Sequence, residues 1–404
     1  MITLKKNDNL TITHKTGYYC LLALIWSRRT FFVFVVQIIN RLPIIGLISN
    51  WIYPILILIS TLVALPYMAK FIKGEDLIGF FIGLFLLVSS MIVHQGHAIY
   101  LEQEIFNIIS LMLFFFIGIS FNVNEIKEIL FWVSLIGVIS SLLYQFYSIA
   151  SGRELLSDNL GAAYNVLPSM MYIIYYAFIQ KKTRYWFLVG ACFILIFSFG
   201  SRGPILCMIS FFLIGLYVVL MRARSGYYQV IYLLIACLII GLLYTNILPN
   251  IIEKISAFFR DMGLSTRVFE YFLAGDIAND SGRNELQQKV WQALLDKPIF
   301  GYGIMGDRVI LNGTYVHNII LEVLCNFGFV LGTGLLLALV ILLIKAVNKS
   351  QTTSELLFIL MMISMVIIKL MLSGAYVVEQ WFYFMLGLAV CYTRKMKEGK
   401  KSTK

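Results

Sequence analysis

Two arginines stand where a bound anion would be a favourable partner. Arg202 lies in the segment Gly200–Pro204, between two apolar stretches of the chain. An arginine this close to hydrocarbon is costly, so it usually faces a protein interior or an aqueous cavity. The flanking glycines would let a backbone or a ligand approach closely. These features favour a functional arginine over the alternative, a turn residue whose side chain reaches back to the membrane interface.

The second arginine, Arg283, stands at the start of a predicted helix. A cation at this position interacts unfavourably with the helix dipole, at a free-energy cost of a few tenths to about 1 kcal/mol. A bound anion would reverse that balance, because helix N-termini and arginine both favour phosphate oxygens. The alternative interpretation is an exposed arginine in solvent.

A histidine follows a glycine-rich turn. Gly301-Tyr302-Gly303 precedes Tyr315-Val316-His317-Asn318, which leads directly into an apolar stretch. A histidine at a membrane mouth can exchange protons near neutral pH. The alternative is a histidine that only hydrogen-bonds a neighbour.

Two charges are expected at similar depth in neighbouring spans. Glu322 lies five positions after His317, and Lys369 lies about five residues from the outer end of the next span. Because unpaired charges at that level are expensive, we expect Glu322 and Lys369 to form an ion pair below the site.

The composition places these residues in a membrane protein. The chain has 404 residues, of which 60% are hydrophobic and only 13% are charged, and its mean hydropathy is +0.85. Ordinary soluble domains are about half apolar and a quarter charged. The longest uncharged runs are apolar all round instead of alternating, which predicts helices and excludes a barrel. The fold class is therefore an all-α polytopic membrane protein.

About twelve spans can be placed, each near the length that a bilayer core requires. Lys and Arg gather in alternate short connectors, which predicts that both termini are cytoplasmic and explains most of the net charge of +11 without a nucleic-acid partner. Arg28 and Arg29 interrupt the first span, which therefore has an uncertain start. The expected spans are 22–42, 47–68, 77–93, 105–121, 129–149, 164–180, 185–200, 204–221, 229–247, 317–344, 355–373 and 376–393.

One long connector breaks the pattern of short loops. We expect residues 1–247 to form an N-terminal bundle of about nine spans, 248–316 a large external loop, 317–393 about three further spans, and 394–404 a basic cytoplasmic tail. Within the loop, apolar residues recur every four positions through Arg283–Asp296, which predicts a helix that Ser281 could cap and Lys297-Pro298 would end.

Other classes of site have weaker support. The six cysteines all fall in apolar segments, so neither a disulfide framework nor a zinc site is expected. His94 and His97, with Glu102 and Glu104 nearby, permit an external metal site, but we expect a loop without metal. No internal repeat is evident, which weighs against a transporter of two similar halves. No cleavable signal peptide is evident either.

Taken together, these motifs resemble the superfamily of O-antigen polymerases and O-antigen ligases, which includes capsular polysaccharide polymerases. The resemblance rests on Arg202 at an outer helix end, Arg283 in a large late loop, the Gly301–Gly303 turn, and His317-Asn318 entering a span. It implies a GT-C-like membrane glycosyltransferase in a bacterial cytoplasmic (inner) membrane, acting on its outer face.

The resemblance also implies the chemistry. Donor and acceptor would be glycans linked to undecaprenyl diphosphate, with the lipid tail in a groove between spans among the membrane lipids. Arg202 and Arg283 would stabilise the diphosphate leaving group without a metal or other cofactor, and His317 would act as general base. The expected substrate-binding residues are Arg202, Arg283, Gly301, Tyr302, Gly303, Tyr315 and Asn318. A chain-length regulator is a possible partner.

Three functions remain open. The predicted loop carries about as many acids as bases, whereas a ligase is expected to need a basic surface for the phosphorylated lipid A core; this favours a polymerase. A transporter or a lipid-linked oligosaccharide flippase is the third alternative. It would be expected to place charges near the membrane midplane, whereas the polar groups here gather at the outer boundary.

Tyr271, Tyr302 and Tyr315 are candidates for stacking on sugars.

Overall fold

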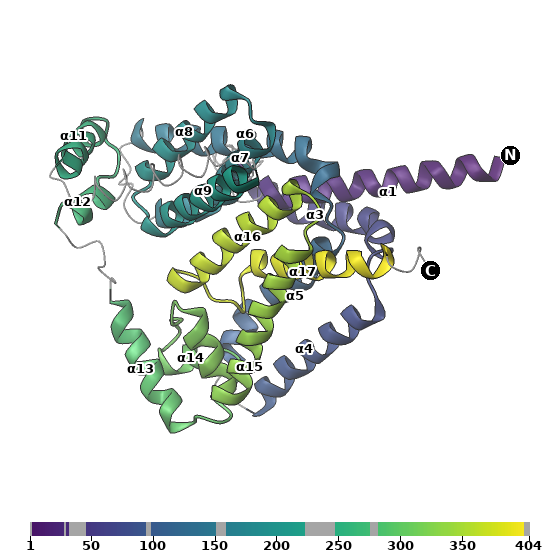
Figure 1. Cartoon of the computed structure of the whole chain (residues 1–404). Coiled ribbons are helices and arrows are strands. Elements are labelled where there is room, and N and C mark those ends of the chain that lie inside the picture. The colour runs from purple at the N-terminus through teal and green to yellow at the C-terminus, as the bar shows by residue number, and fades with distance from the viewer. Residues whose placement is uncertain are drawn as a thin grey trace. The chain divides into compact units, whose positions relative to one another are not determined.

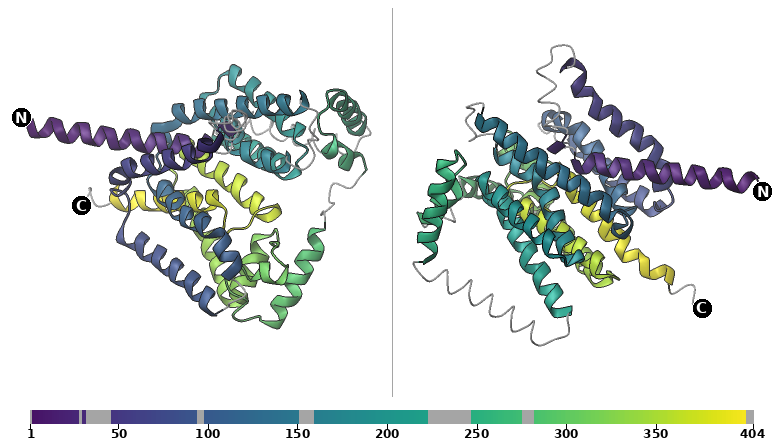
Figure 2. Two further views of the ribbon diagram at one scale, coloured as in Figure 1. Left: turned by 180° about the vertical axis from the view of Figure 1, so that it is seen from behind. Right: turned by 90° about the horizontal axis from the view of Figure 1, so that it is seen from above.

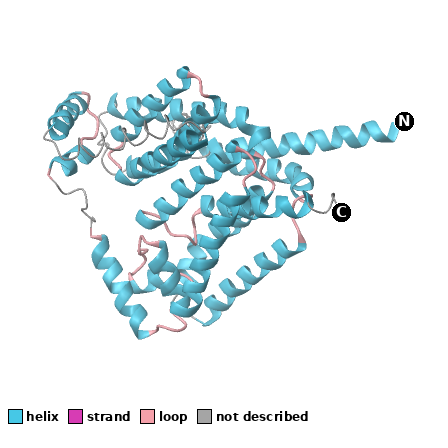
Figure 3. Ribbon diagram, in the orientation of Figure 1, coloured by secondary structure: helices cyan, strands magenta, loops and turns pink. Residues whose placement is uncertain are grey.

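The computed structural model describes residues 2–27, 30–31, 46–93, 98–150, 159–222, 247–274 and 282–399. Within these ranges the chain consists of helices and their connections, with no strand (Figures 1 and 3). The all-α prediction is therefore confirmed for the described residues.

Ten of the expected spans coincide with described helices, which begin and end a few residues from the expected limits. The first helix instead starts at Ile2 and runs straight to Ser27 (Figure 2). Most of the expected spans 22–42 and 229–247 lies outside the described residues, as do Arg28, Arg29, His94 and His97. The helices are α1 (Ile2–Ser27), α3 (Gly46–Met68), α4 (Gly74–Val93), α5 (Ala98–Ile119), α6 (Val123–Ala150), α7 (Asn159–Gln180), α8 (Thr183–Ser198), α9 (Arg202–Arg222), α11 (Ile247–Asp261), α12 (Arg267–Leu273), α13 (Arg283–Asp296), α14 (Gly306–Ile310), α15 (Ile319–Lys349), α16 (Thr353–Leu372) and α17 (Gln380–Gly399).

Several helices have the length and composition of membrane spans. Among the described residues, five qualify: Val123–Tyr147, Gly161–Gln180, Arg202–Met221, Ile319–Lys349 and Thr353–Leu372. Shorter apolar helices cover Ile52–Met68, Ser110–Ile119 and Thr183–Ser198. These helices support a multi-pass membrane protein, while the number of twelve spans and the sidedness of the loops stay predictions.

The chain divides into two compact units. The first contains Met1–Leu65 and Val123–Asn279, and the second contains Pro66–Asn122 and Asp280–Lys404. The segment 248–316, expected to be one external loop, is therefore divided, with α11 and α12 in the first unit and α13 and α14 in the second.

The first unit is built around α7. Its residues from Met170 to Ala177 are almost completely buried, and α6, α8 and α9 pack against it. Two buried polar side chains of this unit are paired: the indole of Trp26 donates to Ser134 Oγ (3.0 Å), and the hydroxyl of Tyr172 donates to the Lys127 carbonyl (2.9 Å). This pairing lowers the cost of burying polar groups in an apolar interior.

Close contact of α5 with α17 organises the second unit. A Cβ on Gly118 would collide with the Phe384 carbonyl, and one on Gly387 would collide with the Phe115 carbonyl. Glycine at both positions therefore lets the two backbones touch, as small residues do at contacts between membrane helices.

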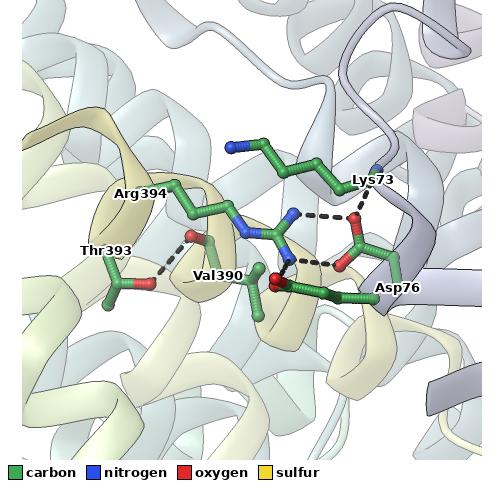
Figure 4. A network of polar contacts seen from close by, with 6 residues as sticks. Lys73, Asp76, Val390, Thr393 and Arg394 are labelled. Atoms are coloured by element: carbon green, nitrogen blue, oxygen red, sulfur yellow. Dashed lines mark hydrogen bonds and ion pairs between the residues drawn. The ribbon is translucent and has the colours of Figure 1, made fainter. Parts of the chain in front are cut away.

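An ion pair fixes the end of α17 to the start of α4 (Figure 4). Arg394 donates from Nη1 and Nη2 to the two carboxylate oxygens of Asp76 at 2.7 and 2.6 Å. Asp76 Oδ2 also accepts from the Lys73 amide at 2.8 Å. Arg394, where the basic tail was expected to begin, is therefore part of α17, which continues to Gly399.

Replacing Arg394 by Met should destabilise the second unit by about 2–4 kcal/mol, because it leaves the buried Asp76 carboxylate without its cation. Thermal unfolding of the detergent-solubilised protein would measure this loss. Glu75→Gln is the matched control, since Glu75 is 85% exposed and 3.8 Å from the same guanidinium, and it should change little. Equal unfolding temperatures for the two variants would contradict a stabilising role for the Asp76–Arg394 pair.

Candidate functional site

The predicted loop helix is present as α13, from Arg283 to Asp296. Val290 and Leu294 are fully buried, and Leu286 packs against the hydrophobic core cluster that contains Val290. The four-residue spacing of these apolar residues thus predicted the packed face correctly. Ser281, the expected cap, lies outside the described residues, and the N-cap is Gly282, whose φ is 83°.

The loop that follows α13 is joined to a break in α15. Gly328, with φ of 73°, interrupts the helix and frees backbone groups on either side. Three backbone hydrogen bonds fill the break: Tyr302 N to Cys325 O (2.7 Å), Gly303 N to Asn326 O (2.9 Å) and Phe329 N to Pro298 O (2.7 Å). The loop and the broken helix therefore hold each other in place.

Glycines make this close approach possible. Gly301 has φ of 65°, and a Cβ on it would lie 2.5 Å from the Cys325 carbonyl oxygen. A Cβ on Gly328 would collide with the Ile299 carbonyl. The geometry gives Gly301 and Gly303 a structural role, and their expected contact with substrate stays a prediction.

His317 lies in a tight turn at the start of α15. Its φ is 56°, and the centroid of its ring is 4.1 Å from that of Tyr315. The next residue, Asn318, is the N-cap of α15, and its side-chain oxygen accepts from the amides of Ile320 (3.0 Å) and Leu321 (3.3 Å). Because this oxygen is used in capping, the structure explains Asn318 without a substrate.

The turn before His317 is held from two sides. The hydroxyl of Tyr315 donates to the Ser373 carbonyl at 2.9 Å, and the amide of Val316 donates to Asp307 Oδ2 at 3.1 Å. The guanidinium carbon of Arg308 lies 5.9 Å from the centre of the Tyr315 ring. These contacts position the imidazole of His317 through the backbone before it and through the neighbouring Tyr315 ring.

Asp307 and Arg308 are site residues that the sequence analysis did not single out. Both are buried, with exposures of 0% and 6%. Asp307 Oδ1 and Arg308 Nη1 have no hydrogen-bond partner among the described residues. Burial raises the pKa of Asp307, and the neighbouring Arg308 opposes that rise. A signal for them was available, because this adjacent pair of charges stands between apolar residues of a short helix.

Electrostatics connect His317 with Arg283. Burial lowers the pKa of His317 to about 4, and repulsion by Arg283 contributes to the shift. The imidazole is therefore neutral near pH 7, and Arg283 is close enough to act on it. His317 Nδ1 is buried and has no hydrogen-bond partner in the described part of the chain.

The prediction that Glu322 and Lys369 pair with each other is wrong. Lys369 pairs with Glu379, which lies in the connection between α16 and α17. Glu322 is buried, and its Oε2 accepts from the Tyr376 amide at 2.9 Å. The connection that supplies Glu379 thus meets both charged residues, so they need not meet each other.

Arg202 belongs to the first compact unit, where it begins α9. Its guanidinium carbon lies 4.5 Å from the centre of the Tyr271 ring, and that of Arg267 lies 5.6 Å from the same centre. Tyr271 is thus a partner for two guanidinium groups. Arg267 is a second cation that was not singled out in the sequence.

The glycines beside Arg202 admit protein groups. A Cβ on Gly200 would collide with Ser265 Oγ, and one on Gly203 would collide with the Tyr164 hydroxyl. Their small size is thus explained by packing within the first unit, although the sequence had suggested close approach of a ligand as well.

No group of three metal-ligating His, Cys, Asp or Glu residues occurs among the described residues. His94 and His97, the alternative metal ligands, lie outside the described ranges, so that alternative is not tested.

Comparison with known protein families supports the resemblance seen in the sequence. A family model described as O-antigen ligase matches residues 186–337, which include Arg202, Arg283 and His317. No match was found among curated proteins.

Replacing Tyr315 by Phe and by Leu should separate its hydroxyl from its ring. Phe should destabilise the protein by about 1 kcal/mol through loss of the bond to Ser373, while keeping the ring contact with His317. Leu should also release the imidazole and lower the turnover rate. Thermal unfolding and steady-state kinetics measure the two effects. Tyr315→Phe could instead leave the stability unchanged and raise KM as much as Tyr315→Leu does. That result would show that the hydroxyl binds substrate and does not anchor the turn.

Proposed function

We propose that this chain is a polymerase of lipid-linked glycan repeat units, because a family model described as O-antigen ligase matches its residues 186–337. It would join undecaprenyl-diphosphate-linked oligosaccharides into O-antigen or capsular polysaccharide on the outer face of a bacterial cytoplasmic membrane. The apolar helices support a reaction at the membrane, where both lipid-linked reactants are already confined to one plane.

The observation that carries this proposal is the turn that holds His317 at the start of α15, where burial and the charge of Arg283 lower the pKa of the imidazole. Glycosyl transfer from a lipid diphosphate needs a base for the acceptor hydroxyl and a cation for the leaving group. An imidazole with a pKa of about 4 is unprotonated near pH 7 and can accept a proton. A guanidinium stays charged under the same conditions and favours phosphate oxygens.

In the proposed step, a hydroxyl oxygen of the acceptor sugar attacks the anomeric carbon of the donor. The bond between that carbon and the phosphate oxygen breaks, and its electron pair leaves with undecaprenyl diphosphate. The hydroxyl proton passes to His317 and then to solvent. Donor binding would neutralise Arg283, which raises the basicity of His317 when the base is needed.

Arg202 is proposed to contribute a second positive charge toward the diphosphate. In its own unit it lies at the start of α9, over the Tyr271 ring and near Arg267. Two neighbouring guanidinium groups that share an aromatic partner make this region positive, as binding of an anion requires.

An O-antigen ligase is the second candidate, and the description of the matching family favours it. Both reactions use the same donor chemistry and differ in the acceptor, which for a ligase is lipid A core. The near balance of acids and bases in residues 248–316 favours the polymerase. The glycan that accumulates when the protein is missing distinguishes the two.

His317→Ala should lower turnover by roughly 100-fold or more, as expected for loss of a general base. Arg283→Ala and Arg202→Ala should also be strongly impaired. Lys289→Ala is the control, because Lys289 is an exposed cation on the same helix as Arg283. The measurement is the surface polysaccharide profile of a strain lacking the protein and complemented with each variant at matched membrane levels.

Single attached repeat units in the null strain and in the three site variants would support the polymerase. Loss of all attachment, with long lipid-linked chains accumulating, would identify a ligase. Normal long chains in the three variants would overturn the assigned site and leave transport as the next function to test.

The pKa of His317 should rise when Arg283 is replaced by Gln. Removing a nearby positive charge makes protonation easier, so the pKa should move from about 4 toward the ordinary value of 6.5. Nuclear magnetic resonance of labelled histidines, assigned with a His317→Gln variant, measures it. In the wild type, kcat/KM should not fall through a group titrating near 6.5. A His317 pKa unchanged by Arg283→Gln would show that the two groups are not coupled.

A further inference from the structure

Large apolar side chains are exposed on the second unit outside the expected spans. Trp291 and Leu295 on α13 are 44% and 56% exposed, and Ile299 and Phe300 in the following loop are 58% and 86% exposed. Exposed apolar residues gathered in this way usually mark a surface that is covered in the working protein.

These residues form one of three faces of α13 and its extension. Trp291 and Leu295 are four residues apart and share a face. The buried Val290 and Leu294 form the face against α15, while Lys289 and Gln292 belong to an exposed polar face. An apolar face, a polar face and a packed face are what a helix at the boundary between a protein, a membrane and water requires.

The break in α15 identifies the level of that boundary. Before Gly328, residues such as Val323, Leu324 and Cys325 are buried within the protein. After it, Val330 and Leu331 are 75% and 52% exposed, and exposed apolar residues continue to Ile344. The second part thus has the surface of a helix that faces lipid.

The length of α15 places the hydrocarbon boundary at the same level, near Gly328. At 1.5 Å per residue the 31 residues of α15 span about 45 Å, which is more than a hydrocarbon core of about 30 Å needs. The part from Phe329 to Lys349 alone spans roughly 30 Å. The part before Gly328 exceeds this length, so the hydrocarbon begins near Phe329, well after residue 317, where this span was expected to begin.

The exposed apolar face of α13 is continuous with this lipid-facing surface. Trp291 packs edge-on against Phe329 with ring centroids 5.8 Å apart, and Phe329 N donates to the Pro298 carbonyl at 2.7 Å. Ile299 and Phe300 follow Pro298 directly, so they are held at the level of Phe329. Tryptophan is also enriched at membrane interfaces.

We propose that Trp291, Leu295, Ile299 and Phe300 form an interfacial anchor that is inserted into the phospholipid leaflet on the side of α13. The anchor fixes how far α13, and with it Arg283 and His317, stands above the hydrocarbon. This inference concerns the membrane contact of the second unit and does not rest on the proposed glycosyl transfer.

Spin labels on single introduced cysteines test the anchor in the full-length protein in phosphatidylethanolamine and phosphatidylglycerol liposomes. The labelled variants are Leu295→Cys and Phe300→Cys, with Gln292→Cys as the matched control on the polar face of the same helix. The unsubstituted chain, treated identically, supplies the background from native cysteines. Collision rates are measured with oxygen, which concentrates in hydrocarbon, and with a water-soluble nickel chelate.

Labels at 295 and 300 should collide several-fold more often with oxygen than with the chelate, and the label at 292 should show the reverse preference. Chelate access at 295 and 300 equal to that at 292 would overturn the anchor in favour of a solvent-facing surface. Shielding of 295 and 300 from both reagents would overturn it in favour of cover by protein, either a second copy or another part of this chain.

Discussion

The second unit depends on the docking of the loop 298–303 into the break of α15. A helix that breaks in a buried region leaves carbonyl and amide groups without partners, and each such group costs free energy. Here the loop supplies the missing partners for Cys325, Asn326 and Phe329. Because the same loop joins α13 to α14, the break determines where both helices lie and therefore where Arg283 and Asp307 stand relative to His317.

Burial around this docking gives the candidate site its electrostatic character. Asp307 and Glu322 each receive a backbone amide, at Val316 and Tyr376, instead of a full ion pair between side chains. These amides hold the two buried carboxyl groups in place. The site therefore combines a rigid backbone with buried polar groups whose interactions are strengthened by their apolar surroundings.

The sequence predicted the helices well because long apolar runs leave a membrane chain few alternatives to helix, and it predicted α13 because its apolar spacing matched the packed face. It did not predict that Glu379 pairs with Lys369, since equal depth in two spans does not determine the path of the connection between them. It also could not show that the glycines at 200, 203 and 301 admit protein groups. Such contacts join residues far apart in sequence, and no local pattern encodes them.

The choice of residue types follows from what burial does to each. Burial and a neighbouring cation both remove a proton from histidine, because each penalises the charged imidazole. The same burial does not remove the charge of a guanidinium group, which stays protonated in proteins. One partly buried environment therefore keeps His317 unprotonated and Arg283 charged. No separate adjustment of either group is needed. With lysine in place of Arg283, burial would act on both groups in the same direction, and the cation could be lost where the base is gained.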